Sequence, residues 1–284
     1  MSQQKNVFFI CILTTLINYY TMSSSEQRIV LFRKEQMMNI VWIGFSWLLL
    51  MHVLCAILFK LDKKQAFFWI RIISIVLLTQ KIIDYGLSWI QSDFTKMPVE
   101  YSAITYILFS MTFLFNIKLL KTFVTFAAFL SGIGYLITFP FLGSIFIQGN
   151  GLFTTVFALI NHSLLYIGSI LVMRHHLFKT QSKKSILIMT ILVVAFSITM
   201  QFFINFENRY LFIYMLLDGR ILYNLFHNID INGFIYLPYN LLIVSIYLGV
   251  ISIFFKINKK IYNVKQRSEF LLIEKGAIHH EHTV

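Results

Sequence analysis

The sequence predicts an all-α fold: a polytopic transmembrane bundle of seven helices, with a hydrophobic N-terminal segment as a candidate eighth. Of the 284 residues, 58% are hydrophobic and 13% are charged, whereas soluble domains carry roughly 25% charged residues. The apolar residues form continuous runs about as long as a bilayer crossing, which takes about 17–25 residues. A membrane β-barrel would need alternating apolar and polar residues, so these runs indicate helices.

Seven apolar runs mark the predicted helices. They cover approximately residues 37–59, 66–90, 101–117, 120–142, 152–173, 185–206 and 235–255. We therefore divide the chain into an N-terminal hydrophobic segment (1–31), a seven-helix membrane domain (32–255) and a basic tail (256–284). The apolar stretch 6–20 is short for a full span. It is compatible with an extra membrane helix, which we favour, with a signal-peptide core or with an interfacial segment.

The charges between the runs predict the orientation of the chain. Basic residues gather in every second connection, namely 60–64, 118–121, 174–184 and the tail from Lys256. The intervening segments 91–100, 143–151 and 207–234 carry little net positive charge. Because basic loops stay on the cytoplasmic side, we expect a multi-pass protein of the cell membrane with a cytoplasmic C-terminus.

The net charge of +12 predicts membrane lipids as partners. A nucleic-acid binder would carry its basic residues as a patch on a folded domain, whereas here they flank apolar runs and would meet anionic headgroups.

Cys11 and Cys55 lie inside apolar stretches without metal-ligand spacing, which is typical of small buried residues. The terminal HHEH motif (279–282) is typical of a solvated tail, and we expect no cofactor and no metal.

Polar residues within the apolar runs are the candidate site, because charged side chains in membrane helices tend to face a bundle interior or a wet cavity. Lys81 and Asp84 are three residues apart and can pair on one helix face. Pro98 and Glu100 are explained by the start of a helix, where a proline and an acid are favourable. The predicted orientation brings this site to an outward-opening cavity. The residues of this candidate site are Lys81, Asp84, Glu100, Ser102, Asn161, His162 and Asn205.

Five motifs follow one another along the membrane domain. They are FRKEQMMNIV (32–41), the segment 98–140 with Pro98, Gly132, Gly134 and Pro140, FALINHSLLYIGSILVM around His162, NRYLF (208–212) and GFIYLPYNL (233–241). In this order they resemble the YwaF family of bacterial integral membrane proteins over about residues 32–255. The family's animal relatives include an acyltransferase that moves fatty acyl chains between lipids, with a cysteine and a histidine as the proposed catalytic pair. The resemblance thus implies a lipid-facing site for acyl transfer or hydrolysis.

The chain departs from that family pattern at three positions. Gln36 and Glu100 stand where the family has histidines, and Ser102 stands where it has a cysteine. Of the implied constellation, His162 remains. A serine nucleophile needs an adjacent base, so Ser102 requires the His162 ring within hydrogen-bond reach, with Glu100 or Asp84 orienting it.

Three function classes follow from these observations. The substitutions favour a lipid-binding or accessory membrane protein without catalysis. The alternative is a membrane acyltransferase or lipid ester hydrolase, with Ser102 as the nucleophile, His162 as the base and Glu100 as the third member. A small-solute transporter is the other alternative. Its support is the charged pair within the bundle, and the sequence lacks the matched broken helices of many transporter folds.

Overall fold

The apolar runs fold as helices, as predicted. The computed structural model describes residues 27–90, 97–203 and 237–281, with side chains over 38–90, 97–149, 151–200 and 238–264. The helices are α2 (Gln27–Leu58), α3 (Lys63–Ile90), α4 (Tyr101–Leu114), α5 (Lys121–Asn150), α6 (Leu152–His175), α7 (Lys183–Phe203) and α10 (Leu237–Glu281), with a short 3-10 turn η1 (Thr180–Ser182) before α7. Over these ranges there is no β-strand. The predicted extra membrane helix at 6–20 lies outside the described residues.

Six of the described helices are long and apolar enough to cross a membrane. The exception is α4, for which the sequence predicts a span over 101–117. Its 14 residues amount to about 21 Å of helix, which is short for a hydrocarbon core of about 30 Å. The helix ends at Leu114 with Phe115 as its C-cap residue, and the next residue, Asn116, adopts a left-handed backbone with φ of 55°. Asparagine is one of the few residue types that adopt this conformation readily.

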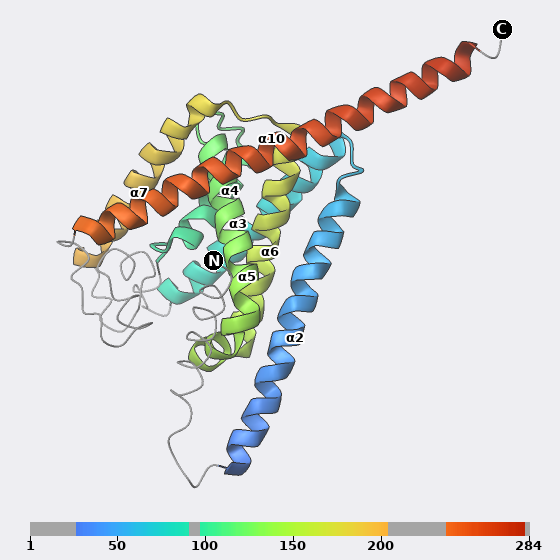
Figure 1. The fold of residues 1–284 in the computed structure, drawn as a ribbon. Coiled ribbons are helices and arrows are strands. Elements are labelled where there is room, and N and C mark those ends of the chain that lie inside the picture. The colour runs from blue at the N-terminus through green and yellow to red at the C-terminus, as the bar shows by residue number, and fades with distance from the viewer. Residues whose placement is uncertain (1–26, 91–96, 204–236, 282–284) are drawn as a thin grey trace.

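Helix α6 is the centre of the bundle. In its most apolar window 72% of the residues are buried, against 33% or less in the five other candidate spans. Figure 1 shows α6 beside α5, with α2 along one side of this pair and α10 crossing over it obliquely. The most extensively buried of these helices is therefore also the one that carries His162 and Tyr166.

Small residues allow the central helices to approach closely, as is typical of helix packing in membranes. A Cβ atom placed on Gly132 of α5 would lie 2.7 Å from the Tyr166 backbone nitrogen and 2.8 Å from the His162 carbonyl oxygen on α6. A Cβ on Gly44 of α2 would lie 2.7 Å from the Cα atom of Pro140 on α5. These two glycines thus set the distances of α6 and α2 from α5.

The connection between α5 and α6 is shorter than the sequence predicts. Helix α5 continues through the expected loop 143–151 to Asn150, and α6 begins at Leu152. Gly151 between them has φ of 81° and ψ of 158°, a backbone conformation that is essentially restricted to glycine. One residue therefore breaks what would otherwise be a continuous helix.

Helix α10 also runs further than the predicted span 235–255, because it continues through the predicted tail as one helix of 45 residues. The fully buried Asn258 links α10 to the end of α6 through hydrogen bonds. Its side-chain nitrogen donates to the carbonyls of Met173 (3.0 Å) and His176 (2.9 Å), and its side-chain oxygen accepts from the Phe178 amide (2.9 Å). These bonds satisfy backbone groups that the end of α6 leaves unpaired.

The segment before α4 is held by α7. Pro98 lies outside the helix, three residues before Tyr101, so the expected first-turn position of this proline is wrong; Glu100 is the N-cap residue instead. The hydroxyl of Ser197 on α7 donates to the Val99 carbonyl at 2.7 Å. This contact places the start of α4, and with it Ser102, against α7.

Candidate functional site

The predicted pair of charges lies on α3. Lys81 Nζ is 3.5 Å from Asp84 Oδ2, and the two side chains are 15% and 34% exposed. The same ammonium lies 5.0 Å from the ring centroid of Tyr106 on α4 and 5.7 Å from that of Tyr85. Such cation–π contacts stabilise an ammonium that has lost part of its water. Lys81 is therefore held between a carboxylate and two aromatic rings.

His162 lies behind Tyr106 in the same cluster. Its ring stacks on Tyr135 of α5 with 4.2 Å between centroids, and it meets Tyr106 edge to face at 5.6 Å. His162 Nδ1 is 2.9 Å from the Ser131 carbonyl oxygen. Since a carbonyl only accepts, Nδ1 carries the proton, which leaves Nε2 of the neutral ring as an acceptor. The structure thus brings Lys81, Asp84 and His162 into one cluster joined by Tyr106.

Ser102 is not joined to this histidine. It is half-buried in the first turn of α4, and among the described residues no hydrogen bond links it to His162. Tyr106, one turn further along α4, is the residue that contacts the His162 ring. Glu100 is the N-cap residue before that turn and makes no side-chain capping bond. The arrangement required of a Ser–His pair therefore stays a prediction.

The two predicted asparagines have different outcomes. Asn161 is buried at 2% exposure, and its Oδ1 has no hydrogen-bond partner in the part of the chain that the structure describes. Asn161 and Gly168 lie seven residues apart and share a face of α6. A Cβ on Gly168 would touch Phe109 of α4 and Ile73 of α3, so Asn161 faces this side of the bundle. Asn205 lies outside the described residues.

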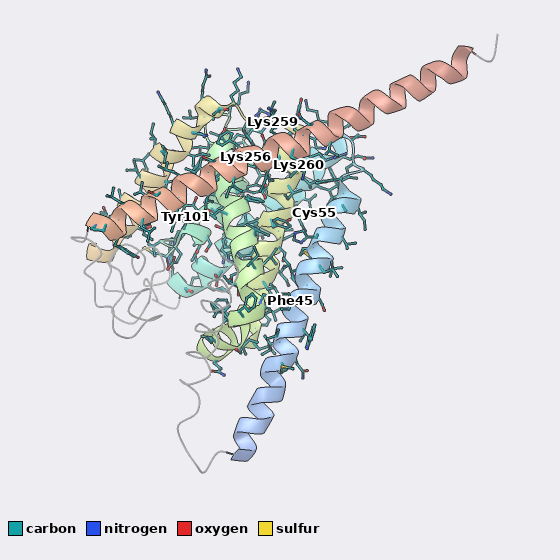
Figure 2. All side chains as sticks on the ribbon, in the orientation of Figure 1. Phe45, Cys55, Tyr101, Lys256, Lys259 and Lys260 are labelled. Atoms are coloured by element: carbon teal, nitrogen blue, oxygen red, sulfur yellow. The ribbon has the colours of Figure 1, made fainter. Side chains whose placement is uncertain are left out.

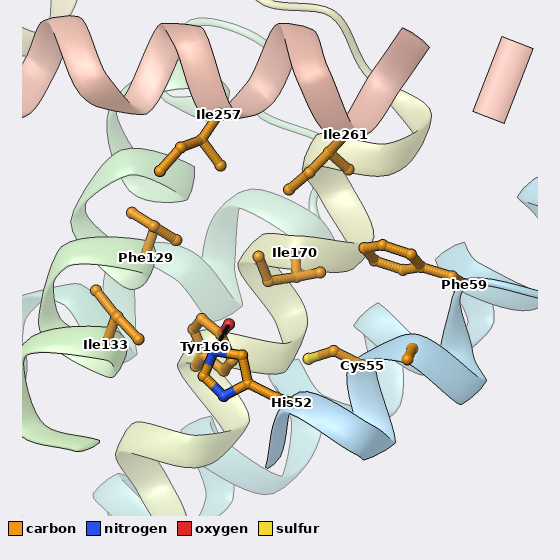
Figure 3. A pocket seen from close by; sticks show the side chains of 10 residues that line it. His52, Cys55, Phe59, Phe129, Ile133, Tyr166, Ile170, Ile257 and Ile261 are labelled. Carbon is orange, nitrogen blue, oxygen red and sulfur yellow. Dashed lines mark hydrogen bonds between the residues drawn. The ribbon is translucent and has the colours of Figure 1, made fainter. Parts of the chain in front are cut away.

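A second site, which the sequence does not predict, is a pocket of about 380 Å³ between α2, α5, α6 and α10. Figure 3 shows Phe129 and Ile133 on one side of it, Ile257 and Ile261 above, and His52 next to Tyr166 below. Its lining consists of His52, Cys55, Ala56, Phe59, Phe129, Ile133, Tyr166, Ile170, Ile257 and Ile261. Most of these side chains are hydrocarbon, which is typical of sites for apolar ligands.

The two ring side chains with polar atoms in the pocket wall, His52 and Tyr166, are hydrogen-bonded. His52 Nδ1 is 2.8 Å from the Leu48 carbonyl oxygen, which can only accept, so this nitrogen donates the hydrogen bond. His52 Nε2 forms a hydrogen bond with the Tyr166 hydroxyl, at 3.3 Å. Cys55, 6% exposed, is a free thiol and confirms the expectation of a small buried residue; Cys11 lies outside the described residues. The wall therefore presents few unpaired polar groups to an apolar occupant.

Sequence reasoning missed this pocket for a physical reason. His52, Cys55, Ala56 and Phe59 follow the spacing i, i+3, i+4, i+7, which marks one face of a helix. That pattern was the available signal, and it also describes an ordinary buried face. The partners Tyr166 and Ile257 come from helices more than 100 residues away in the chain, and no local pattern reveals them.

Comparison of the chain with protein-family models, curated proteins and solved structures finds no match. The resemblance to the YwaF family therefore stays a prediction. What the fold establishes is a helical protein of the multi-pass membrane type, with a polar cluster among α3, α4, α5 and α6 and an apolar pocket beneath α10.

Proposed function

We propose that the protein is a lipid-binding membrane protein, and that the pocket between α2, α5, α6 and α10 takes a lipid acyl chain. The observation that carries the proposal is the lining of this pocket, which is hydrocarbon except for a thiol and the bonded pair His52–Tyr166. An acyl chain needs no hydrogen-bond partner when it is buried against these apolar side chains. It would also leave few polar atoms of the pocket wall without a hydrogen bond.

Lipid has direct access to this pocket. His52 and Ala56 both line it and are exposed at the surface of α2. On the same helix Leu49, Val53 and Ile57 are 66%, 48% and 57% exposed, which in a membrane-spanning helix places them among acyl chains. The pocket is thus continuous with a surface that is suited to hydrocarbon.

The volume suits one chain rather than a whole phospholipid. About 380 Å³ is near the lower end of the roughly 300–1,000 Å³ that ligand sites occupy. A lipid with one chain in the pocket would leave its other chain in the bilayer and its headgroup at the membrane surface.

A large side chain at Ala56 tests the proposal, because this residue lines the pocket without being part of the buried core. The full-length protein is purified in detergent, and retained phosphatidylcholine is measured by native mass spectrometry. Ala56→Trp should reduce retention severalfold. Ile57→Trp, which places the same side chain at the next residue of α2, should not. Equal retention in both variants and the wild type would refute the proposal.

Acyl transfer through Ser102 and His162, and solute transport through Lys81 and Asp84, stay alternative predictions. A serine-reactive lipid-like probe distinguishes the first from simple lipid binding. An enzyme would be labelled at Ser102, with labelling lost in His162→Ala. A transporter would show substrate uptake that changes when Lys81 or Asp84 is replaced. The lipid-binding proposal expects neither result.

A further inference from the structure

We infer that the pocket selects an anionic phospholipid from the leaflet at the basic end of the bundle, and that Lys60 and Lys260 bind its phosphate. The inference rests on the proposed function and adds to it the headgroup class, the leaflet and the residues that recognise the headgroup.

Both lysines adjoin residues that line the pocket. Lys60 follows Phe59 at the end of α2, and Lys260 precedes Ile261 on α10. In Figure 3, Phe59 and Ile261 lie toward the same end of the pocket, away from Ile133. Long ammonium side chains extend from an apolar surface toward a polar boundary. The two lysines therefore stand at the end of the pocket where a headgroup would lie.

A third cation lies against the wall of the pocket. The Arg174 guanidinium is 4.8 Å from the ring centroid of Phe59, and the arginine is 8% exposed. It belongs to the last turn of α6. Its positive charge is thus held close to the pocket at the depth of Phe59, while Lys60 and Lys260 are exposed at the surface.

The charges at this end favour an anion. Among the described side chains near it, Asp62 is the one acidic residue, and its carboxylate accepts from the Gln65 backbone N–H at 2.8 Å. Neither Lys60 nor Lys260 forms an ion pair with a described acidic residue. Lys256 adds further positive charge on the same stretch of α10, where Figure 2 labels it together with Lys260. The phosphate of an anionic headgroup carries no positive group beside it and is attracted by these basic residues. The phosphate of a phosphatidylcholine headgroup is followed by a positively charged choline, which the same residues repel.

Two matched double variants test the inference. Lys60→Gln with Lys260→Gln removes the lysines beside the pocket. Lys64→Gln with Lys259→Gln makes the same charge change with exposed lysines of neighbouring segments. Lys259 lies roughly opposite Ile257 and Ile261 around α10, because residues two apart are about 200° apart on a helix. The probes are phosphatidylglycerol and phosphatidylcholine with identical acyl chains, offered together to the full-length protein and counted by native mass spectrometry.

The wild type should retain phosphatidylglycerol over phosphatidylcholine by roughly tenfold, since each lysine near a surface contributes a several-fold preference for anionic lipid. The Lys60/Lys260 variant should lose most of this preference and keep its phosphatidylcholine, while the Lys64/Lys259 variant should keep the preference. A wild type without preference, or an equal loss in both variants, would overturn the inference and leave lipid binding intact. If Ala56→Trp retains both lipids like the wild type, the proposed function itself fails.

Discussion

Tyr166 on α6 forms a hydrogen bond with His52 on α2, with 3.3 Å between Oη and Nε2. The two residues are 114 positions apart in the chain, and their rings lie in contact with 5.5 Å between centroids. The bond fixes the face of α2 that lines the pocket against the central helix. It therefore links the packing of the bundle to the shape of the proposed lipid site.

A double-mutant cycle measures this link. Tyr166→Phe and His52→Ala should each lower the free energy of unfolding in detergent, and together they should cost less than the sum. The expected coupling is about 0.6 kcal/mol, the average for hydrogen bonds between membrane helices. Additive effects would mean that the hydroxyl and the imidazole do not interact in the folded protein.

Gly132→Ala should destabilise the protein strongly, because the new methyl group would meet the α6 backbone at 2.7 Å. Overpacking of this kind costs about 1–3 kcal/mol. Gly134→Ala is the matched control on the same helix, since nothing lies within 4 Å of its Cβ position. It should be neutral or stabilising by up to about 1 kcal/mol. Thermal unfolding in detergent measures both, and similar melting temperatures would contradict the close approach of α5 and α6.

The pH dependence of stability should include a contribution from His176, just beyond the end of α6. Burial, with a smaller effect of Lys121 and Lys63, holds the pKa of His176 below its usual range. The folded state therefore favours the neutral ring. This contribution is fully present above the unfolded pKa of about 6.5 and is lost as the pH falls through the lower folded pKa.

Substitution of His176 tests that dependence. Between pH 7 and pH 5 the melting temperature of the wild type should fall more than that of His176→Gln, because glutamine cannot be protonated in this range. The difference between the two curves isolates His176 from all other titrating groups. Parallel curves would show that the ring titrates equally in the folded and unfolded states.

The predicted orientation is tested by labelling single cysteines. With Cys11 and Cys55 replaced by serine, Lys184→Cys reports the basic end of the bundle and Gln148→Cys the opposite end. Both positions are exposed. A membrane-impermeant maleimide added to intact cells should label position 148 and spare position 184 until the membrane is opened. The reverse pattern would place the basic end outside the cell and contradict a cytoplasmic C-terminus.

The sequence predicts the helices better than it predicts their contacts. Apolar length locates every described helix, because the bilayer demands such runs wherever it is crossed. The end of α5 was placed too early, since the string Gln148–Gly151 reads as a loop although only Gly151 leaves the helical conformation. The continuation of α10 beyond Lys256 was missed because polar residues end a membrane span without ending a helix.

In the candidate site, too, the sequence predicts features within one helix but not the contacts between helices. The pairing of Lys81 with Asp84 follows from spacing on one helix, and it is present. The rings around His162 come from α4 and α5, and their positions depend on which helices pack side by side. The pocket depends on α2, α5, α6 and α10 together, so no single segment could indicate it. Polar residues attracted attention in the sequence, whereas an apolar pocket is built from residues that look like ordinary core.

Photo-crosslinking in the membrane tests the central claim, lipid in the pocket, most directly. Phosphatidylcholine with a diazirine in one acyl chain is incorporated into membranes that contain the full-length protein and irradiated, and the adducts are mapped by mass spectrometry. We predict adducts on the pocket residues Phe129, Ile133 and Ile170, present in the wild type and in Ile57→Trp and lost in Ala56→Trp. Adducts confined to exposed residues such as Leu49 and Val53, and unchanged by Ala56→Trp, would contradict the account.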